Sequence, residues 1–81
     1  MDRTQVLAQL SAIMQEVLDD PSVTLTPTTT ADDVEDWDSM SNITFVVEVE
    51  RRLGIKFNTA EIEEMRNVGD MLDMIVAKRS A

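Results

Sequence analysis

The spacing of apolar residues near the start of the chain constrains the fold most. Between Thr4 and Leu18, apolar side chains recur every three or four residues, which places them on one face of a helix. Asp2 or Thr4 is suited to cap the beginning of this helix, and Pro21 ends it because proline disfavours helical geometry in the preceding residue. The apolar face consists of Val6, Leu7, Leu10, Ile13, Met14, Val17 and Leu18.

Residues 39–53 repeat the helical spacing, and Gly54 is a natural residue to end a helix there. The β-branched residues from Ile43 to Val49 would also allow a strand, but the length of the segment favours a helix. Residues 55–57 then form a short extended linker whose apolar residues plug the core. The second element is therefore predicted to be a helix over residues 39–53.

Two more helices are predicted after the linker. Asn58 or Thr59 caps a brief helix that runs through Met65, and Asn67 followed by Asp70 is similar to a capping box at the start of the last helix. The buried stripe of the last helix would be Met71, Leu72, Ile75 and Val76. We expect an all-α fold in a single domain over residues 1–81, with three main helices, one short helix and one long loop.

The long loop lies between Pro21 and Asp38. A loop of about twenty residues in a compact domain normally needs internal packing or a function. Val23 and Leu25 are candidates to anchor it to the core. A short strand or helical turn within the loop remains open.

The residues that are missing exclude most kinds of catalysis. The chain contains no Cys and no His, which removes thiol nucleophiles, His-dependent triads and Cys/His zinc sites. With 16 acidic and 7 basic residues its net charge is −9, which disfavours nucleic acid and anionic membranes and attracts basic protein surfaces. No signal peptide and no membrane span is recognisable. We expect a cytoplasmic protein that is not an enzyme and holds no metal.

Residues 32–40 carry the pattern that matters most for function, because an acidic run leads into the predicted helix at Ser39. An EF-hand loop beginning at Asp36 would place Met40 fifth and Val47 twelfth, where oxygen ligands belong, so this calcium site is excluded. A nucleophile elbow needs glycines on both sides of the serine, and Ser39 has none. From the residues alone, Asp36, Asp38 or Ser39 is simply a helix cap.

Asp38-Ser39-Met40 at the start of a helix resembles the Asp-Ser-Leu signature of acyl and peptidyl carrier proteins. Segments 48–57 and 67–71 also fall where this family has them, so the resemblance covers nearly the whole chain. It implies an acyl-carrier-like four-helix bundle with 4′-phosphopantetheine joined to Ser39 by a phosphodiester. Asp38 would position metal and coenzyme while a phosphopantetheinyl transferase attaches the group.

The resemblance also implies how the carrier meets its partners. Met40, Ile43 and Val47 would dock partner enzymes, with Glu48 contributing charge, although Ile43 and Val47 are alternatively ordinary core residues. The expected partners are an acyl-activating ligase, synthase or acyltransferase, and the carrier is expected to be a monomer. An acyl chain would be sheltered in a cavity lined by Phe45, Val46, Val49, Phe57, Ile62 and Met65.

Several positions depart from the common pattern of the family. Ser41 and Thr44 stand where acidic residues are frequent, and Arg51-Arg52 interrupts the acidic end of the helix. Trp37 directly precedes the Asp-Ser pair, and a Trp at this position resembles specialised carriers. We expect its side chain to act as a lid that packs the long loop onto the bundle. We therefore expect a pathway-specific acyl carrier serving fatty-acid, polyketide or related biosynthesis. An aminoacyl or peptidyl carrier, or an unmodified acidic interaction domain, is the alternative.

Overall fold

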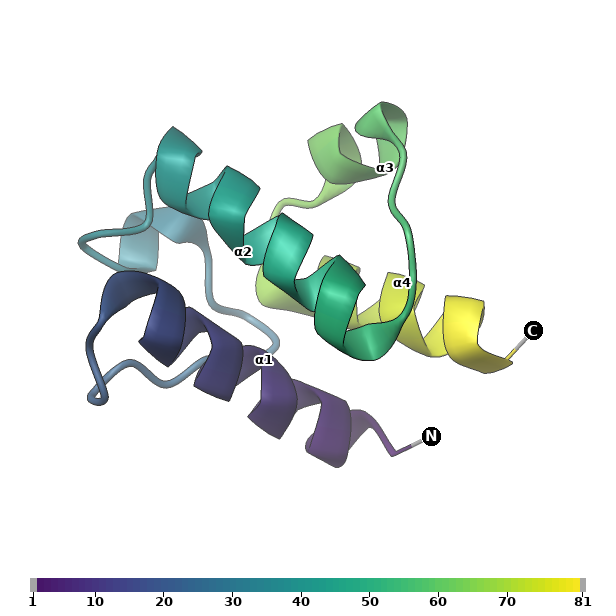
Figure 1. The fold of residues 1–81 in the computed structure, drawn as a ribbon, viewed down its shortest axis with the longest axis horizontal. Coiled ribbons are helices and arrows are strands. Elements are labelled where there is room, and N and C mark those ends of the chain that lie inside the picture. Colours follow the sequence, from purple (N-terminus) through teal and green to yellow (C-terminus); the bar gives the residue numbers. More distant parts are fainter. Residues whose placement is uncertain (1, 81) are drawn as a thin grey trace.

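Three long helices and one short helix make up the fold of residues 2–80, the range that the computed structural model describes. In chain order they are α1 (Arg3–Leu18), the single 3-10 turn η1 (Ala31–Asp33), α2 (Ser39–Leu53), α3 (Thr59–Glu64) and α4 (Val68–Ser80). α1 packs against both α2 and α4, and α1 and α2 run in opposite directions (Figure 1). Residues 2–80 contain no strand, so the predicted all-α class is confirmed and residues 43–49 are helical.

Side chains at the N-terminal ends explain where the helices begin. The Asp2 carboxylate accepts the backbone N–H of Thr4 at 2.9 Å, so Asp2 rather than Thr4 caps α1. Asn58, not Thr59, caps α3: its Oδ1 accepts the N–H of Glu61, whose carboxylate accepts the N–H of Asn58. These caps satisfy amides that have no partner within the helix.

Two residues with positive φ end the long helices. Gly54 ends α2 with φ of 67°, as the sequence predicts, because glycine adopts this conformation without steric cost. Asp19 ends α1 with φ of 53°, so this helix stops two residues before Pro21. α3 ends at Glu64, one residue earlier than predicted.

The start of α4 is fixed both by a cap and by the long loop. Asn67 Oδ1 accepts the N–H of Asp70, as predicted, but the Asp70 carboxylate accepts the N–H of Arg66 instead of closing a box on Asn67. The N–H of Val68 donates to the carbonyl of Thr29 at 2.9 Å, and that of Gly69 donates to the carbonyl of Pro27 at 2.8 Å. Loop carbonyls thus supply the acceptors for the first amides of α4.

The long loop is packed rather than loose. Leu25 is buried, its N–H donates to Ser11 Oγ on α1, and Gln15 Nε2 donates to the carbonyl of Val23. The Thr29 side chain is also buried, and its hydroxyl accepts the N–H of Thr26 at 2.8 Å. The loop also contains the 3-10 turn η1, which settles the open question in favour of a helical turn.

The core lies between α1, α2 and α4. Its buried residues are Val6, Leu10, Ile13, Met14, Leu25, Phe45, Val46, Val49, Leu53, Phe57, Val68, Met71, Leu72 and Ile75. No helix within residues 2–80 has the length and apolar character needed to span a bilayer.

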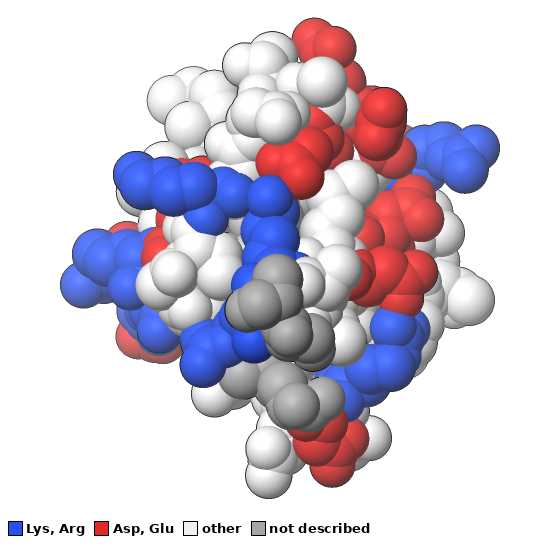
Figure 2. Space-filling model, turned by 90° about the vertical axis from the view of Figure 1, so that its right-hand side faces the viewer, with Lys and Arg blue, Asp and Glu red and all other residues white. Residues whose placement is uncertain are grey.

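Positive charge is distributed unevenly over the molecule. The sequence has no Lys or Arg between Arg3 and Arg51, whereas the segment 19–38 contains seven acidic residues. Figure 2 views the end where the termini lie, and basic side chains gather there among acidic ones. Ser39 lies at the opposite end of α2 from Arg51 and Arg52.

Candidate functional site

Ser39 is the first residue of α2 and is exposed. The preceding residue, Asp38, is the N-cap: its backbone is extended and its carboxylate accepts the N–H of Ser41 at 2.9 Å. Within residues 2–80, no other residue forms a hydrogen bond with the Ser39 hydroxyl, so Asp38 rather than Ser39 performs the capping. The hydroxyl is therefore available for chemistry with an outside reagent.

Asp38 is held in its ionised form. The backbone N–H of Ser41, and after it the Ser41 hydroxyl, hydrogen-bond the carboxylate and lower its pKa below the usual 3.8. A hydrogen bond to the charged form of a carboxyl group stabilises that form. Asp38 thus places a negative charge on the residue that precedes Ser39 at neutral pH.

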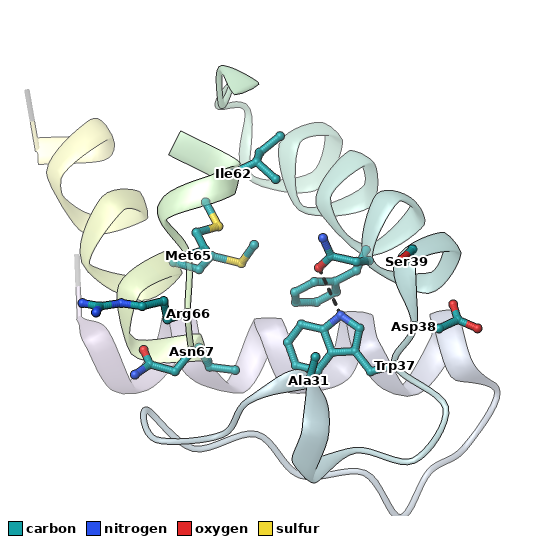
Figure 3. Close-up of a pocket in the computed structure, with 12 residues that line it drawn as sticks. Ala31, Trp37, Asp38, Ser39, Ile62, Met65, Arg66 and Asn67 are labelled. Carbon is teal, nitrogen blue, oxygen red and sulfur yellow. Dashed lines mark hydrogen bonds between the residues drawn. The ribbon is translucent and has the colours of Figure 1, made fainter. Parts of the chain in front are cut away.

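A pocket of about 350 Å³ opens next to Ser39. It lies between the start of α2, the turn η1 and the segment that joins α3 to α4 (Figure 3). Its lining combines apolar and polar side chains, and Figure 3 shows Trp37 and Met65 on its walls. The lining residues are Ala31, Trp37, Asp38, Ser39, Asn42, Phe45, Ile62, Met65, Arg66, Asn67, Val68 and Met71.

Trp37 forms one wall of this pocket. Its ring meets that of Phe45 edge to face, with centroids 5.6 Å apart and an interplanar angle of 69°, a favourable geometry for an aromatic pair. Its indole N–H donates to Asn42 Oδ1 at 3.0 Å (Figure 3). These contacts pin the end of the long loop onto α2, which is the packing expected of the predicted lid.

The structure divides the predicted cavity residues into two groups. Phe45, Ile62 and Met65 line the pocket beside Ser39. Val46, Val49 and Phe57 are buried in the core and do not line it. The pocket therefore ends at Phe45 and Met71 instead of extending along the buried face of α2.

Sequence reasoning missed Asn42 as a pocket residue. Asn42 lies three residues after Ser39, and residues three apart are neighbours on a helix surface. That spacing was the available signal. A polar residue on a helix surface has no distinctive pattern, however, until its partner Trp37 is placed.

The predicted docking residues form an exposed stripe along α2. Met40, Ile43 and Val47 are exposed by 79%, 65% and 51%, so Ile43 and Val47 are not core residues. The stripe begins directly after Ser39 and leads away from it along the helix. Large apolar side chains this exposed on a small protein are typical of an interaction surface.

Glu48 does not add a free charge to this stripe. Its carboxylate pairs with Arg51 at 2.6 Å and with Arg52 at 3.2 Å, and Arg52 also pairs with Glu16 on α1. The hydrogen bond from Arg51 is the main cause that lowers the pKa of Glu48. Glu50, the other acidic residue within α2, accepts the N–H of Phe57 at 2.8 Å.

Comparison with known proteins agrees with this geometry. A family model described as the phosphopantetheine attachment site matches residues 8–75. An acyl carrier protein from Tropheryma whipplei (strain Twist) is 34% identical over 82 residues, covering 99% of this chain and 98% of that protein. One from Acidothermus cellulolyticus is 29% identical over 75 residues, covering 93% of this chain and 89% of that protein.

A solved structure is similar as well. The solution NMR structure of a holo acyl carrier protein from Geobacter metallireducens matches with a TM-score of 0.87 at 37% identity, covering 93% of this chain and 86% of that chain. The chain belongs to the acyl carrier protein family, whose defining prosthetic group is covalently attached phosphopantetheine. Proteins of this family carry intermediates and do not catalyse reactions, which agrees with the expectation that the chain is not an enzyme.

Proposed function

We propose that this protein holds acyl intermediates as thioesters on a 4′-phosphopantetheine arm attached to Ser39 and delivers them to biosynthetic enzymes. The observation that carries the proposal is the exposed hydroxyl of Ser39 on the first turn of α2, beside a pocket. The thiol of the arm supplies the thioester chemistry, which the chain cannot supply because it has no cysteine.

Ser39 and Asp38 have separate roles in the attachment. The Ser39 oxygen forms a new bond to the phosphorus of coenzyme A that carries the pantetheine, the pyrophosphate linkage breaks, and the hydroxyl proton leaves to a base of the transferase. Asp38 is ionised and fixed by its bond to Ser41, so its carboxylate can bind a magnesium ion that the coenzyme phosphates also bind. A phosphate at this helix N-terminus also meets free amides.

The exposed stripe of Met40, Ile43 and Val47 would bind the partner enzymes. Because Glu48 is neutralised by Arg51 and Arg52, the stripe is apolar instead of acidic. Basic docking surfaces suited to a strongly acidic helix would find little charge to pair with here. This supports a specialised carrier with its own acyl-activating ligase, synthase or acyltransferase. We propose that it acts as a cytoplasmic monomer.

The test is intact mass after incubation with coenzyme A, magnesium and a broad-specificity phosphopantetheinyl transferase. Wild type is expected to gain one phosphopantetheine, and Ser39→Ala none. Ser41→Ala is the matched control, because it removes a hydroxyl two residues away but keeps the backbone N–H that binds the Asp38 carboxylate. No gain in wild type, with a transferase shown to modify another carrier, would instead favour an unmodified interaction domain.

The specialised partner set has its own test. The protein and a housekeeping fatty-acid carrier would compete for a housekeeping synthase, with binding measured by surface plasmon resonance. We expect the housekeeping carrier to bind more tightly. Equal binding would overturn the pathway-specific assignment and leave the carrier function untouched.

A further inference from the structure

The side-chain amide of Asn42 offers the pocket a hydrogen-bond donor that the protein itself does not use. Its Oδ1 accepts the indole N–H of Trp37 at 3.0 Å. An indole nitrogen can only donate, so the atom that faces it must be the amide oxygen, and this fixes the orientation of the amide. Within residues 2–80, Asn42 Nδ2 donates to no other residue, and no side-chain nitrogen there is both buried and unpaired. Nδ2 is therefore exposed to solvent, and Asn42 is among the residues that line the pocket.

Asn42 also lies on the path from the proposed attachment point. It follows Ser39 by three residues on α2, and residues at this spacing lie on the same side of a helix. Both residues line the same pocket. A chain tethered to Ser39 that folds back into the pocket therefore passes the free amide hydrogens of Asn42.

The pocket also limits the size of its occupant. Phe45 and Met71, which are both buried, close it toward the core. Beyond them, Val49 and Leu72 are packed with almost no exposure, so a chain that extends past the pocket into the core would have to displace core side chains. Displacing close-packed core residues is costly. A short chain fits without this cost.

We propose that the pocket selects a short acyl cargo bearing a hydroxyl or keto oxygen, and that Asn42 is the residue that recognises this oxygen. The inference rests on the proposed attachment at Ser39. The apolar walls of Trp37, Ile62 and Met65 contact the carbon chain, while Asn42 Nδ2 donates to the oxygen. Trp37 acts as a positioning residue. Its indole N–H binds Asn42 Oδ1, which leaves Asn42 Nδ2 on the side of the amide that faces away from the indole.

The experiment compares four forms of the protein, which the transferase prepares from different coenzymes. Coenzyme A gives the form without cargo, and its butanoyl, 3-hydroxybutanoyl and octanoyl thioesters give the three acylated forms. Intact mass first verifies loading, so a failure of the proposed function is recognised before the cargo is compared. NMR then follows the side-chain amide of Asn42 and the indole N–H of Trp37, the only tryptophan in the chain. The rate of thioester hydrolysis in buffer measures how well each cargo is sheltered.

The 3-hydroxybutanoyl form is expected to shift both signals. Its hydrolysis should be slower than that of the butanoyl form by roughly two- to tenfold, the effect of one hydrogen bond. Equal signals and equal rates for these two cargoes would overturn the proposal. A full Asn42 shift in the form without cargo would also overturn it, because the acceptor would then be a carbonyl of the arm. So would octanoyl protection equal to that of the hydroxylated cargo.

Two variants isolate the donor. Asn42→Asp keeps an oxygen for the Trp37 indole but removes the amide hydrogens, so it should abolish the difference between hydroxybutanoyl and butanoyl. Thr44→Ala is the control on the same helix, since Thr44 is exposed and donates only to the Met40 carbonyl. A retained difference in Asn42→Asp would contradict the role of Asn42. If this variant does not fold, the comparison of hydroxybutanoyl and butanoyl cargoes in wild type still tests the proposal.

Discussion

The backbone N–H of Gly69 donates to the carbonyl oxygen of Pro27 at 2.8 Å, and a β-carbon at Gly69 would lie only 2.7 Å from that same oxygen. The contact joins the first turn of α4 to the long loop, 42 residues earlier in the sequence, and no pattern of side chains could have linked the two segments. Because the neighbouring atom is backbone, the loop and the helix would have to separate to admit a methyl group. The absence of a side chain at Gly69 is thus a condition for this junction.

Gly69→Ala should therefore destabilise the protein although alanine is the better helix former. Relieving the clash should cost about 1–3 kcal/mol, the usual range for overpacking. The gain in helix propensity is at most about 1 kcal/mol. The free energy of unfolding in urea measures the balance. A variant as stable as wild type would show that the loop does not hold α4 in this way.

Gly54→Ala tests a different cost. Nothing lies within 4 Å of a β-carbon at Gly54, but φ is 67°, so the penalty is conformational. We expect a loss of about 1–2 kcal/mol in the free energy of unfolding. Gly54→Asn should lose less, because asparagine tolerates the left-handed region better than alanine does. Equal losses in the two variants would argue against a conformational origin.

The helices could be predicted from the sequence because each carries its own signal in apolar spacing and caps. The anchoring of the long loop by Leu25 was also predicted and is confirmed. The bonds from Val68 and Gly69 to this loop could not be predicted, since they join backbone groups distant in sequence. Backbone hydrogen bonds leave no trace in the identity of the side chains that they join.

At the candidate site, the motif located Ser39 and Asp38 because the family signature names them directly. The extent of the pocket depended on packing instead. Phe45, Ile62 and Met65 line the pocket, whereas Val46 and Phe57 are buried in the core. That Val46 and Phe57 shelter an acyl chain stays a prediction. The pairing of Glu48 with Arg51 and Arg52 follows from their spacing of three and four residues on one helix. The contact of Arg52 with Glu16 on α1 joins two helices, so spacing along one helix does not reveal it.

Asp38→Asn separates the cap from the charge. Asparagine keeps an oxygen that can accept the N–H of Ser41, so the melting temperature should change little. The rate of modification by the transferase should fall by about tenfold or more, the effect of losing a charged contact. Asp38→Ala should lose both rate and stability. An unchanged rate in Asp38→Asn would remove Asp38 from the attachment step.

Ile43→Glu tests the exposed stripe. Ile43 is largely exposed, so the free energy of unfolding should change by no more than about 0.5 kcal/mol. The kcat/KM of modification by the transferase should fall on the order of tenfold, as expected for an apolar anchor of an interface. Ala60→Glu, exposed on α3 away from the stripe, is the matched control. Similar losses in both variants would point to overall charge instead of docking.

Acid should destabilise the protein. The pKa of Glu61 is lowered from 4.5, chiefly by the backbone N–H of Asn58, and that of Asp38 is lowered from 3.8 by the N–H of Ser41. A depressed native pKa contributes stability that is complete above the unfolded pKa of about 4 and is lost as pH falls through the native value. The free energy of unfolding should therefore decline below about pH 4.

Urea unfolding at a series of pH values measures this decline. Glu61→Gln keeps an acceptor for the capping box but does not titrate, so its decline should be shallower. A rise in stability on acidification would mean that relief of repulsion within a chain of net charge −9 outweighs the loss of these hydrogen bonds.

The uneven placement of the basic residues gives the protein an electric dipole. Arg51 and Arg52 lie at one end of α2, roughly 19 Å along the axis from Ser39. Ser39 follows an acidic segment that contains no Lys or Arg. In the field of a positively charged enzyme, such a molecule experiences a torque before contact and turns its acidic end forward. Its collisions are then already oriented with Ser39 leading, so fewer encounters are lost to the wrong face.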